Sequence, residues 1–161
     1  MGRWKEACIQ LKMVVITAAL GVAATAAPAW GSLGGDAASV QADQVHMRAS
    51  RQTTVAEGYT VHEMHTPGGT VVKEFVSPDG KVFGVAWQGP WPPDMRQVLG
   101  SYFDQYVQAA QSRAGGRIRR GPVMIEQPGL VVHTGGHMRA FGGTAYIPEM
   151  LPSGVRAESI Q

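Results

Sequence analysis

The chain has little cysteine, no apolar run long enough for a membrane span, and almost no net charge once its first residues are set aside. Cys8 is its only cysteine, and we expect the segment that contains it to be removed. A mature protein without cysteine has neither a disulfide nor a thiolate metal site. The uncharged apolar stretch at 13–27 has fifteen residues, whereas a spanning helix needs about 20. We therefore expect a protein held together by packing alone.

The first 29 residues have the three parts of a secretory signal peptide. Basic residues precede the uncharged stretch, and the small residues of Ala27-Pro28-Ala29 follow it. This order is typical of a cleaved leader. We expect cleavage after Ala29 or after Gly31, and a periplasmic or secreted protein with no stable membrane anchor after cleavage. The alternative is an uncleaved anchor, which the short stretch and Pro28 disfavour.

Removal of the leader also removes the apparent basicity of the chain. The full sequence has 14 Lys and Arg against 12 Asp and Glu, and the leader holds three of the bases and one of the acids. Eleven charges of each sign remain, so no field of one sign steers the protein toward nucleic acid. We expect no nucleic-acid partner.

The region that follows the lead-in predicts a three-stranded antiparallel meander. Its strands are rich in Val, Thr and aromatic residues, and each connection contains proline and glycine. Pro67-Gly68 suits a type II turn, and Pro78-Asp79-Gly80 suits a type I turn followed by a glycine bulge. The expected strands are 59–65, 70–77 and 81–88.

The residues from 94 to 112 predict one long amphipathic helix. Apolar side chains recur three and four positions apart from Met95 to Ala110, and polar side chains fill the opposite side. Pro92 and Pro93 precede this pattern, and Gly115-Gly116 ends it. We expect this helix to cover the sheet, with Gly100 allowing a close approach.

A second hairpin is expected near the C-terminus, with strands at 130–134 and 137–141 and its turn at Gly135-Gly136. Residues 144–147 predict a further edge segment. The predicted fold class is α+β: a mostly antiparallel sheet, formed by the meander and this hairpin, covered by one long helix. The domain spans 57–150, after a polar and partly ordered lead-in at 30–56 that includes a short helix capped by Ser39, and before an irregular tail at 151–161.

The connection from Trp87 to Pro93 is the strongest candidate binding surface. It is stiff and aromatic, and a preorganised aromatic loop binds peptides or sugars at low entropic cost. We therefore single out Trp87, Trp91 and Pro92; the alternative is that both rings plug the end of the core. Arg117, Arg119 and Arg120 form a second candidate, either for weak contact with a phosphate-bearing polymer or lipid head group or as a solvated surface.

His133 and His137 flank the predicted hairpin turn and are candidate metal ligands, with Glu126 or His62 as a third. The alternative is that both imidazoles are solvated or bonded to backbone. Glu63 and Glu74 lie on adjacent predicted strands and are candidates for an acid–base pair, or are simply solvated. No cysteine nucleophile, serine elbow or phosphate loop is present. The sequence predicts no catalytic residue and no cofactor.

Several short motifs together resemble a known family. The most distinctive is Gly136-His137-Met138-Arg139-Ala140-Phe141, and others are Leu33-Gly34-Gly35, Trp87-Gln88-Gly89-Pro90, Leu99-Gly100-Ser101-Tyr102-Phe103 and Ala145-Tyr146-Ile147-Pro148. The chain resembles a family of uncharacterised exported proteins of beta-proteobacteria, domain of unknown function family 2844. The resemblance implies a Gram-negative envelope protein and carries no activity, cofactor or site residue with it.

Three functions follow from these observations as hypotheses. The first is a non-catalytic exported envelope protein that binds an envelope protein, peptide or glycan, or assists assembly. The alternative is a metal-binding envelope protein, with hydrolysis as its activity, built around His133 and His137. The third is a purely structural exported protein.

Overall fold

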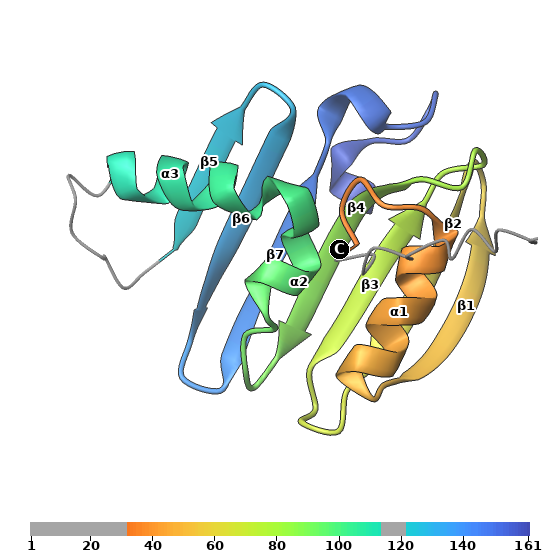
Figure 1. The fold of residues 1–161 in the computed structure, drawn as a ribbon, viewed down its shortest axis with the longest axis horizontal. Helices are drawn as coiled ribbons and strands as arrows, with labels where there is room; N and C mark the ends of the chain where they lie inside the picture. Colours follow the sequence, from red (N-terminus) through yellow and green to blue (C-terminus); the bar gives the residue numbers. More distant parts are fainter. Residues whose placement is uncertain (1–31, 114–121) are drawn as a thin grey trace, which may run out of the picture.

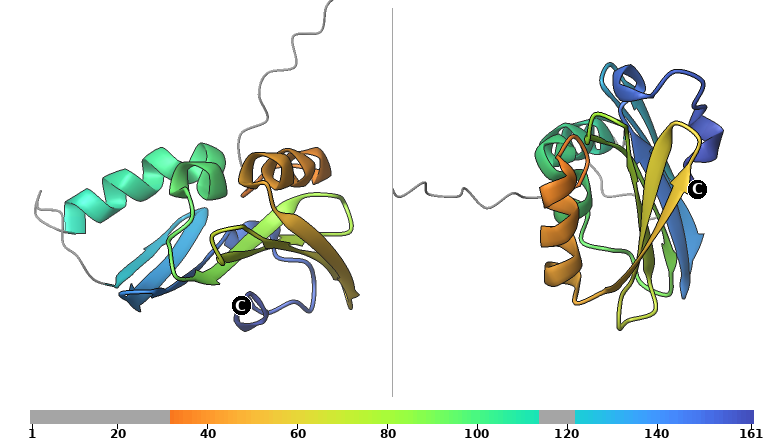
Figure 2. Two further views of the ribbon diagram at one scale, coloured as in Figure 1. Left: turned by 90° about the horizontal axis from the view of Figure 1, so that it is seen from below. Right: turned by 90° about the vertical axis from the view of Figure 1, so that its right-hand side faces the viewer.

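The computed structural model describes residues 32–113 and 122–161. They form a seven-stranded antiparallel sheet with helices on one face and the C-terminal tail on the other (Figure 1 and Figure 2). The strands run in the order β1-β2-β3-β4-β7-β6-β5. The α+β class and the antiparallel sheet predicted from the sequence are confirmed.

The predicted meander is confirmed as β2 (Tyr59–His65), β3 (Val71–Val76) and β4 (Val82–Gly89). Both of its connections have the same form. The N–H of the last glycine, Gly69 or Gly80, donates to the carbonyl of the residue three positions earlier, and φ is 82° at Gly69 and 79° at Gly80. The type II turn predicted at Pro67-Gly68 is therefore wrong, because the positive φ falls one residue later, as in a type I turn with a glycine bulge.

The segment expected to be a partly ordered lead-in forms two regular elements. Helix α1 (Ala37–Met47) begins after Asp36, whose side chain accepts from the N–H of Ala38 at 2.9 Å, so Asp36 and not Ser39 is the cap. Strand β1 (Ser50–Ala56) pairs along its whole length with β2. The apolar stripe of α1 is thin, and its order comes from packing: Val40 is buried in the core.

The predicted single long helix is broken at Gly100. Helix α2 (Met95–Leu99) is followed by a 3-10 turn, η1 (Gly100–Tyr102), and then by α3 (Phe103–Arg113). Gly100 has φ 52° and ψ −124°, which a residue with a side chain rarely adopts. The break lets α2 and α3 take different directions over the β4–β7 and β5–β6 parts of the sheet, while α1 covers the meander (Figure 1).

The C-terminal hairpin is present, but its turn is displaced. Strand β6 (Leu130–His137) continues through both glycines, and the chain turns at Met138 and Arg139, where Arg139 has φ 65°. Its partner β7 (Ala140–Tyr146) lies between β6 and β4, so residues 144–147 are not an edge as expected. Strand β5 (Val123–Gln127), which the sequence did not predict, is the edge on this side of the sheet. The pairing of β4 with β7 joins meander and hairpin into one sheet.

The two faces of the sheet are covered differently. Under the helices, side chains from all three helical segments pack on Met64, Val72, Trp87 and Val132. On the opposite face the tail, with 3-10 turns η2 (Pro148–Met150) and η3 (Ala157–Ser159), crosses part of the sheet (Figure 2). The 3% exposed Ile160 packs there with Phe75 and Phe83, a burial that contributes about 2 kcal/mol. The tail, predicted to be irregular, closes a second core.

Within 32–113 and 122–161, no helix has the length and hydropathy that a membrane span requires.

Candidate functional site

An open groove of about 880 Å³ lies beside the tail, on the face of the sheet opposite the helices. This volume is in the range of small-ligand sites, about 300–1,000 Å³. The groove crosses strands β3, β4, β7 and β6. Its walls and floor include Glu63, Val71, Lys73, Ala86, Gln88, His133, Gly135, Gly142, Thr144 and Gln161.

The register of the strands arranges these residues in two rows. Lys73, Ala86, Thr144 and His133 are successive cross-strand partners, and Val71, Gln88, Gly142 and Gly135 form the next row. Adjacent strands are about 4.8 Å apart, so each row spans about 14 Å. Charged or ionisable side chains stand at the ends of the first row and small ones in its centre, which makes the hollow.

Two glycines in the floor, Gly135 and Gly142, face each other across β6 and β7. Neither has a positive φ. A Cβ on Gly142 would come 3.4 Å from the Trp87 carbonyl oxygen, and one on Gly135 would come 4.0 Å from the Cβ of Pro122, both ordinary contacts. Among the described residues, neither conformation nor space calls for glycine at these two positions. Inside a strand, glycine often marks a place that a ligand or another backbone approaches closely.

At the adjoining positions, Gly136 and Gly143, the structure requires glycine. A Cβ on Gly143 would lie 2.4 Å from Cζ2 of Trp87, which is closer than atoms can pack. Gly136 has φ 129°, and a Cβ there would lie 2.2 Å from the carbonyl oxygen of Ala140. The bare floor at Gly135 and Gly142 is therefore a separate feature from the packing at Gly136 and Gly143.

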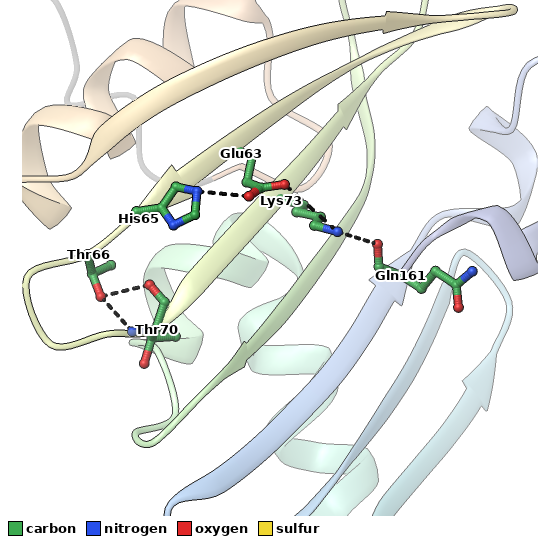
Figure 3. A network of polar contacts seen from close by, with 6 residues as sticks. All are labelled: Glu63, His65, Thr66, Thr70, Lys73 and Gln161. Carbon is green, nitrogen blue, oxygen red and sulfur yellow. Dashed lines mark hydrogen bonds and ion pairs between the residues drawn. The ribbon is translucent and has the colours of Figure 1, made fainter.

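A polar network forms one end of the groove (Figure 3). Lys73 Nζ donates to the backbone oxygen of Gln161 at 3.2 Å and lies 3.9 Å from Glu63 Oε2. The other carboxylate oxygen of Glu63 lies 2.8 Å from His65 Nε2. The two opposite charges of Glu63 and Lys73 balance each other at this end.

The other end of the first row contains His133. Its Nε2 lies 3.6 Å from Glu126 Oε1, which is too long for a hydrogen bond. In the part of the chain that the structure describes, this nitrogen is buried and has no hydrogen-bond partner. His133 is therefore a polar group at the groove whose pairing is incomplete.

The Trp87–Pro93 connection lies at one end of the groove. Trp91 is 62% exposed, and its carbonyl oxygen accepts a 2.7 Å hydrogen bond from Thr70 Oγ1. A Cβ on the groove residue Gly69 would lie 3.6 Å from Pro90, which places the connection next to the groove. Pro92 is exposed as well. Trp87 is only 5% exposed and belongs to the core, which agrees with the alternative that its ring plugs the core.

The two candidate metal ligands are not brought together. His133 and His137 lie four positions apart on β6, about 13 Å along a strand, and do not flank its turn as expected. The paired glycines lie inside the strand, so the geometry assumed for a shared ion is wrong. No group of three His, Cys, Asp or Glu residues within the described ranges is placed to hold a metal ion.

The other candidate site residues lie on opposite faces of the sheet or fall outside the residues that the structure describes. Glu63 pairs across the strands with Lys73, and Glu74 pairs with His62, so the two glutamates lie on opposite faces and do not form an acid–base pair. The candidate arginines Arg117, Arg119 and Arg120, like the predicted leader, lie outside the described residues.

Sequence reasoning missed a buried polar cluster under the helices. Asp43 of α1 accepts from Ser32 Oγ at 2.7 Å and from Gln97 Nε2 at 2.9 Å. Glu74 beside it is fully buried, and neither of its oxygens makes a hydrogen bond of good geometry within the described chain. The even spacing of Glu74 from Val72 and Val76 was the available signal that it faces inward.

Burial, and then the neighbouring Asp43 carboxyl, raise the pKa of Glu74 from 4.5 to about 8, although Ser32 and Arg51 act in the opposite direction. Burial and Arg51 also lower the pKa of His62, the cross-strand partner of Glu74. Glu74 is therefore mainly protonated at neutral pH. Asp43, Gln97 and Glu74 do not line the groove, which lies on the opposite face of the sheet.

No curated protein and no solved structure matches this chain. A family model does match, over residues 29–160, which include every strand of the sheet and all residues of the groove except Gln161. The chain therefore belongs to the family described as Protein of unknown function (DUF2844).

Proposed function

We propose that this protein is a non-catalytic, exported envelope protein that binds a peptide or glycan partner in the groove. The observation that carries the proposal is the bare floor around Gly135 and Gly142, bordered by Glu63, Lys73 and Gln88. A hollow with a few polar groups around it is the usual form of a binding site.

The rigidity of the groove supports binding at low entropic cost. Its floor belongs to β4, β7 and β6, each of which pairs with a strand on both sides. Such strands do not have to become ordered when a partner arrives, so less conformational entropy is lost. The exposed ring of Trp91, on the connection next to the groove, offers a further apolar surface to a partner.

The export part of the proposal rests on the sequence. The first 29 residues have the order of a secretory leader, and the family match begins at residue 29. Expression of the full chain in a Gram-negative host, followed by fractionation and mass measurement, tests it. A product that begins near residue 30 or 32 in the periplasm or medium is expected; a full-length cytoplasmic product contradicts export.

The binding part is tested by capture. Purified protein is immobilised and exposed to envelope extract, and bound peptides and glycans are identified by mass spectrometry. Gly142→Val fills the groove, and Trp91→Ala removes the exposed ring. Val55→Thr is the matched control, because Val55 is 80% exposed on β1, at the edge of the sheet.

We expect one class of partner to be enriched by wild type and by Val55→Thr, and reduced at least tenfold by Gly142→Val. Equal recovery by all variants would remove the groove as the binding surface. Loss with Trp91→Ala alone would place the partner on the loop and not in the groove.

A further inference from the structure

Gly135 and Gly142, which neither conformation nor packing requires to be glycine, limit the kind of ligand that the groove binds. A residue with a side chain fits at Gly135 and at Gly142, and glycine in a strand is unfavourable because it loses more entropy on folding. Their joint effect is a flat, bare patch one strand spacing wide. A ligand that uses this patch is flat where it meets the sheet.

The floor does not offer the backbone groups that extended peptides use. Peptides commonly bind a sheet by adding a strand to a free edge. The floor strands β4, β7 and β6 are interior, and the edges of the sheet are β1 and β5. Recognition in the groove therefore depends on side chains and on contact with the flat floor.

The side chains around the patch favour a neutral ligand rich in hydroxyl groups. Glu63 and Lys73 carry opposite charges at the same end, so they do not select a net charge. With Gln88 and Thr144 they provide both donors and acceptors around an apolar floor. A pyranose ring matches these groups, because it has a flat face of C–H groups and an edge of hydroxyl groups.

We infer that the groove binds a neutral oligosaccharide, with one sugar ring lying on Gly135 and Gly142. This inference rests on the proposed binding function of the groove and specifies its ligand class. The ring contacts the floor through its C–H face, and its hydroxyl groups bond to Gln88, Thr144 and the Glu63–Lys73 pair.

The test is an NMR titration of the protein purified after expression of the full chain. The probes are chitotetraose and maltotetraose as neutral sugars, tetragalacturonate as an acidic sugar, and an N-acetylated, C-amidated tetra-alanine peptide. We expect a neutral sugar to shift the amide resonances of Gly135, Gly142 and Thr144. Gly142→Val is expected to weaken that binding at least tenfold, and Val55→Thr to leave it unchanged.

A second variant, Gly135→Ala, guards against misfolding of the first, since a Cβ there meets only an ordinary contact. A native-like spectrum with weakened sugar binding supports the inference. Groove shifts with the peptide alone, or stronger binding of tetragalacturonate than of either neutral sugar, overturn it and leave groove binding in place. No groove shift with either neutral sugar also overturns it, while the capture experiment decides separately on the proposed function.

Discussion

The covered part of the sheet and the groove are built from the same strands but differ in side-chain size and in their treatment of charge. Under Ile160, β3 and β4 supply Phe75 and Phe83. Three positions further along β4, the residue on this face is Ala86, which belongs to the same cluster and also lines the groove. Beyond Ala86 the floor continues as Thr144, Gly142 and Gly135, so the comparison teaches that small residues hollow this face beside the tail.

The same two regions also differ in the environment of their charged side chains. Under the helices, Glu74 is fully buried beside Asp43, whereas in the groove Glu63 is partly exposed and lies near Lys73. A buried carboxyl without full pairing becomes protonated, and an exposed one keeps its charge in contact with water. Burial of the Glu74 carboxyl therefore lowers the stability of the covered part, whereas the charged groups in the groove remain available to bind a ligand.

The largest expected effect concerns the buried glutamate. The pKa of Glu74 is raised in the folded state, from 4.5 to about 8. The folded state then binds the proton more tightly than the unfolded state, so the stability that protonated Glu74 contributes is fully present below pH 4.5 and is lost as the pH rises to about 8. Because the pKa of Glu74 differs between the two states by several pH units, the loss across this interval is on the order of a few kcal/mol.

Urea unfolding at several pH values, with wild type and Glu74→Gln, measures this effect. We expect the variant to lose most of the decline in stability between pH 5 and pH 8. Glu63→Gln is the matched groove control, where removal of an ion pair near the surface costs at most about 1 kcal/mol. Identical pH profiles for wild type and Glu74→Gln would show that Glu74 does not carry the proton.

The second effect concerns the aromatic cluster under the tail. Phe83→Ala is expected to destabilise the protein by about 3–5 kcal/mol, because Phe83 is fully buried and its removal leaves a cavity. The measurement is urea unfolding, with Val55→Ala as the exposed control, expected within about 0.5 kcal/mol of wild type. A loss below 1 kcal/mol for Phe83→Ala would mean that the tail does not close a core.

The third effect is a difference in stability between substitutions at two neighbouring glycines, Gly143 and Gly142. Gly143→Ala is expected to cost about 1–3 kcal/mol, because its Cβ overlaps the ring of Trp87. Gly142→Ala is expected to stay within about 1 kcal/mol of wild type, on the stabilising side, since alanine restricts the unfolded chain. Thermal unfolding of the two variants in parallel is the measurement. Equal losses would contradict the distinction between floor and core.

The smallest effect is at the end of the groove. Trp91→Ala is expected to change stability by less than about 1 kcal/mol, because the ring is 62% exposed. The change is measured by thermal unfolding, alongside Trp87→Ala, which removes a core ring and is expected to cost about 3–5 kcal/mol. Similar losses for the two would show that Trp91 is a core residue as well.

Local turn chemistry made part of the fold predictable. The Pro-Gly and Pro-Asp-Gly connections determine where the meander turns, and its strands were found within one residue of their observed ends. The same reasoning failed at Gly135-Gly136, because glycine is used inside strands as well as in turns: a Cβ on Gly136 would overlap the neighbouring backbone, and Gly135 belongs to the bare floor of the groove. The single helix failed at Gly100 for a related reason, since a positive φ leaves no mark on the apolar periodicity.

The candidate site was predicted less well than the fold. The Trp87–Pro93 connection was found because aromatic and proline residues are conspicuous in sequence, and Trp91 is indeed exposed. The groove was missed because its residues are unremarkable one by one: Ala86, Gln88, Gly142 and Thr144 become a site only when β4 and β7 pair. The two pairs of adjacent glycines, Gly135-Gly136 and Gly142-Gly143, were the one feature of the sequence that could have indicated the groove.

By itself, the sequence determined the class of the fold, the course of the meander and the absence of a thiol from the described chain, because turns and residue types act over a few neighbouring positions. Only the tertiary structure decided which strands meet, which face the tail closes and where the floor is left bare. Those features depend on contacts between segments far apart in the chain, and their energies come from burial that no local pattern records.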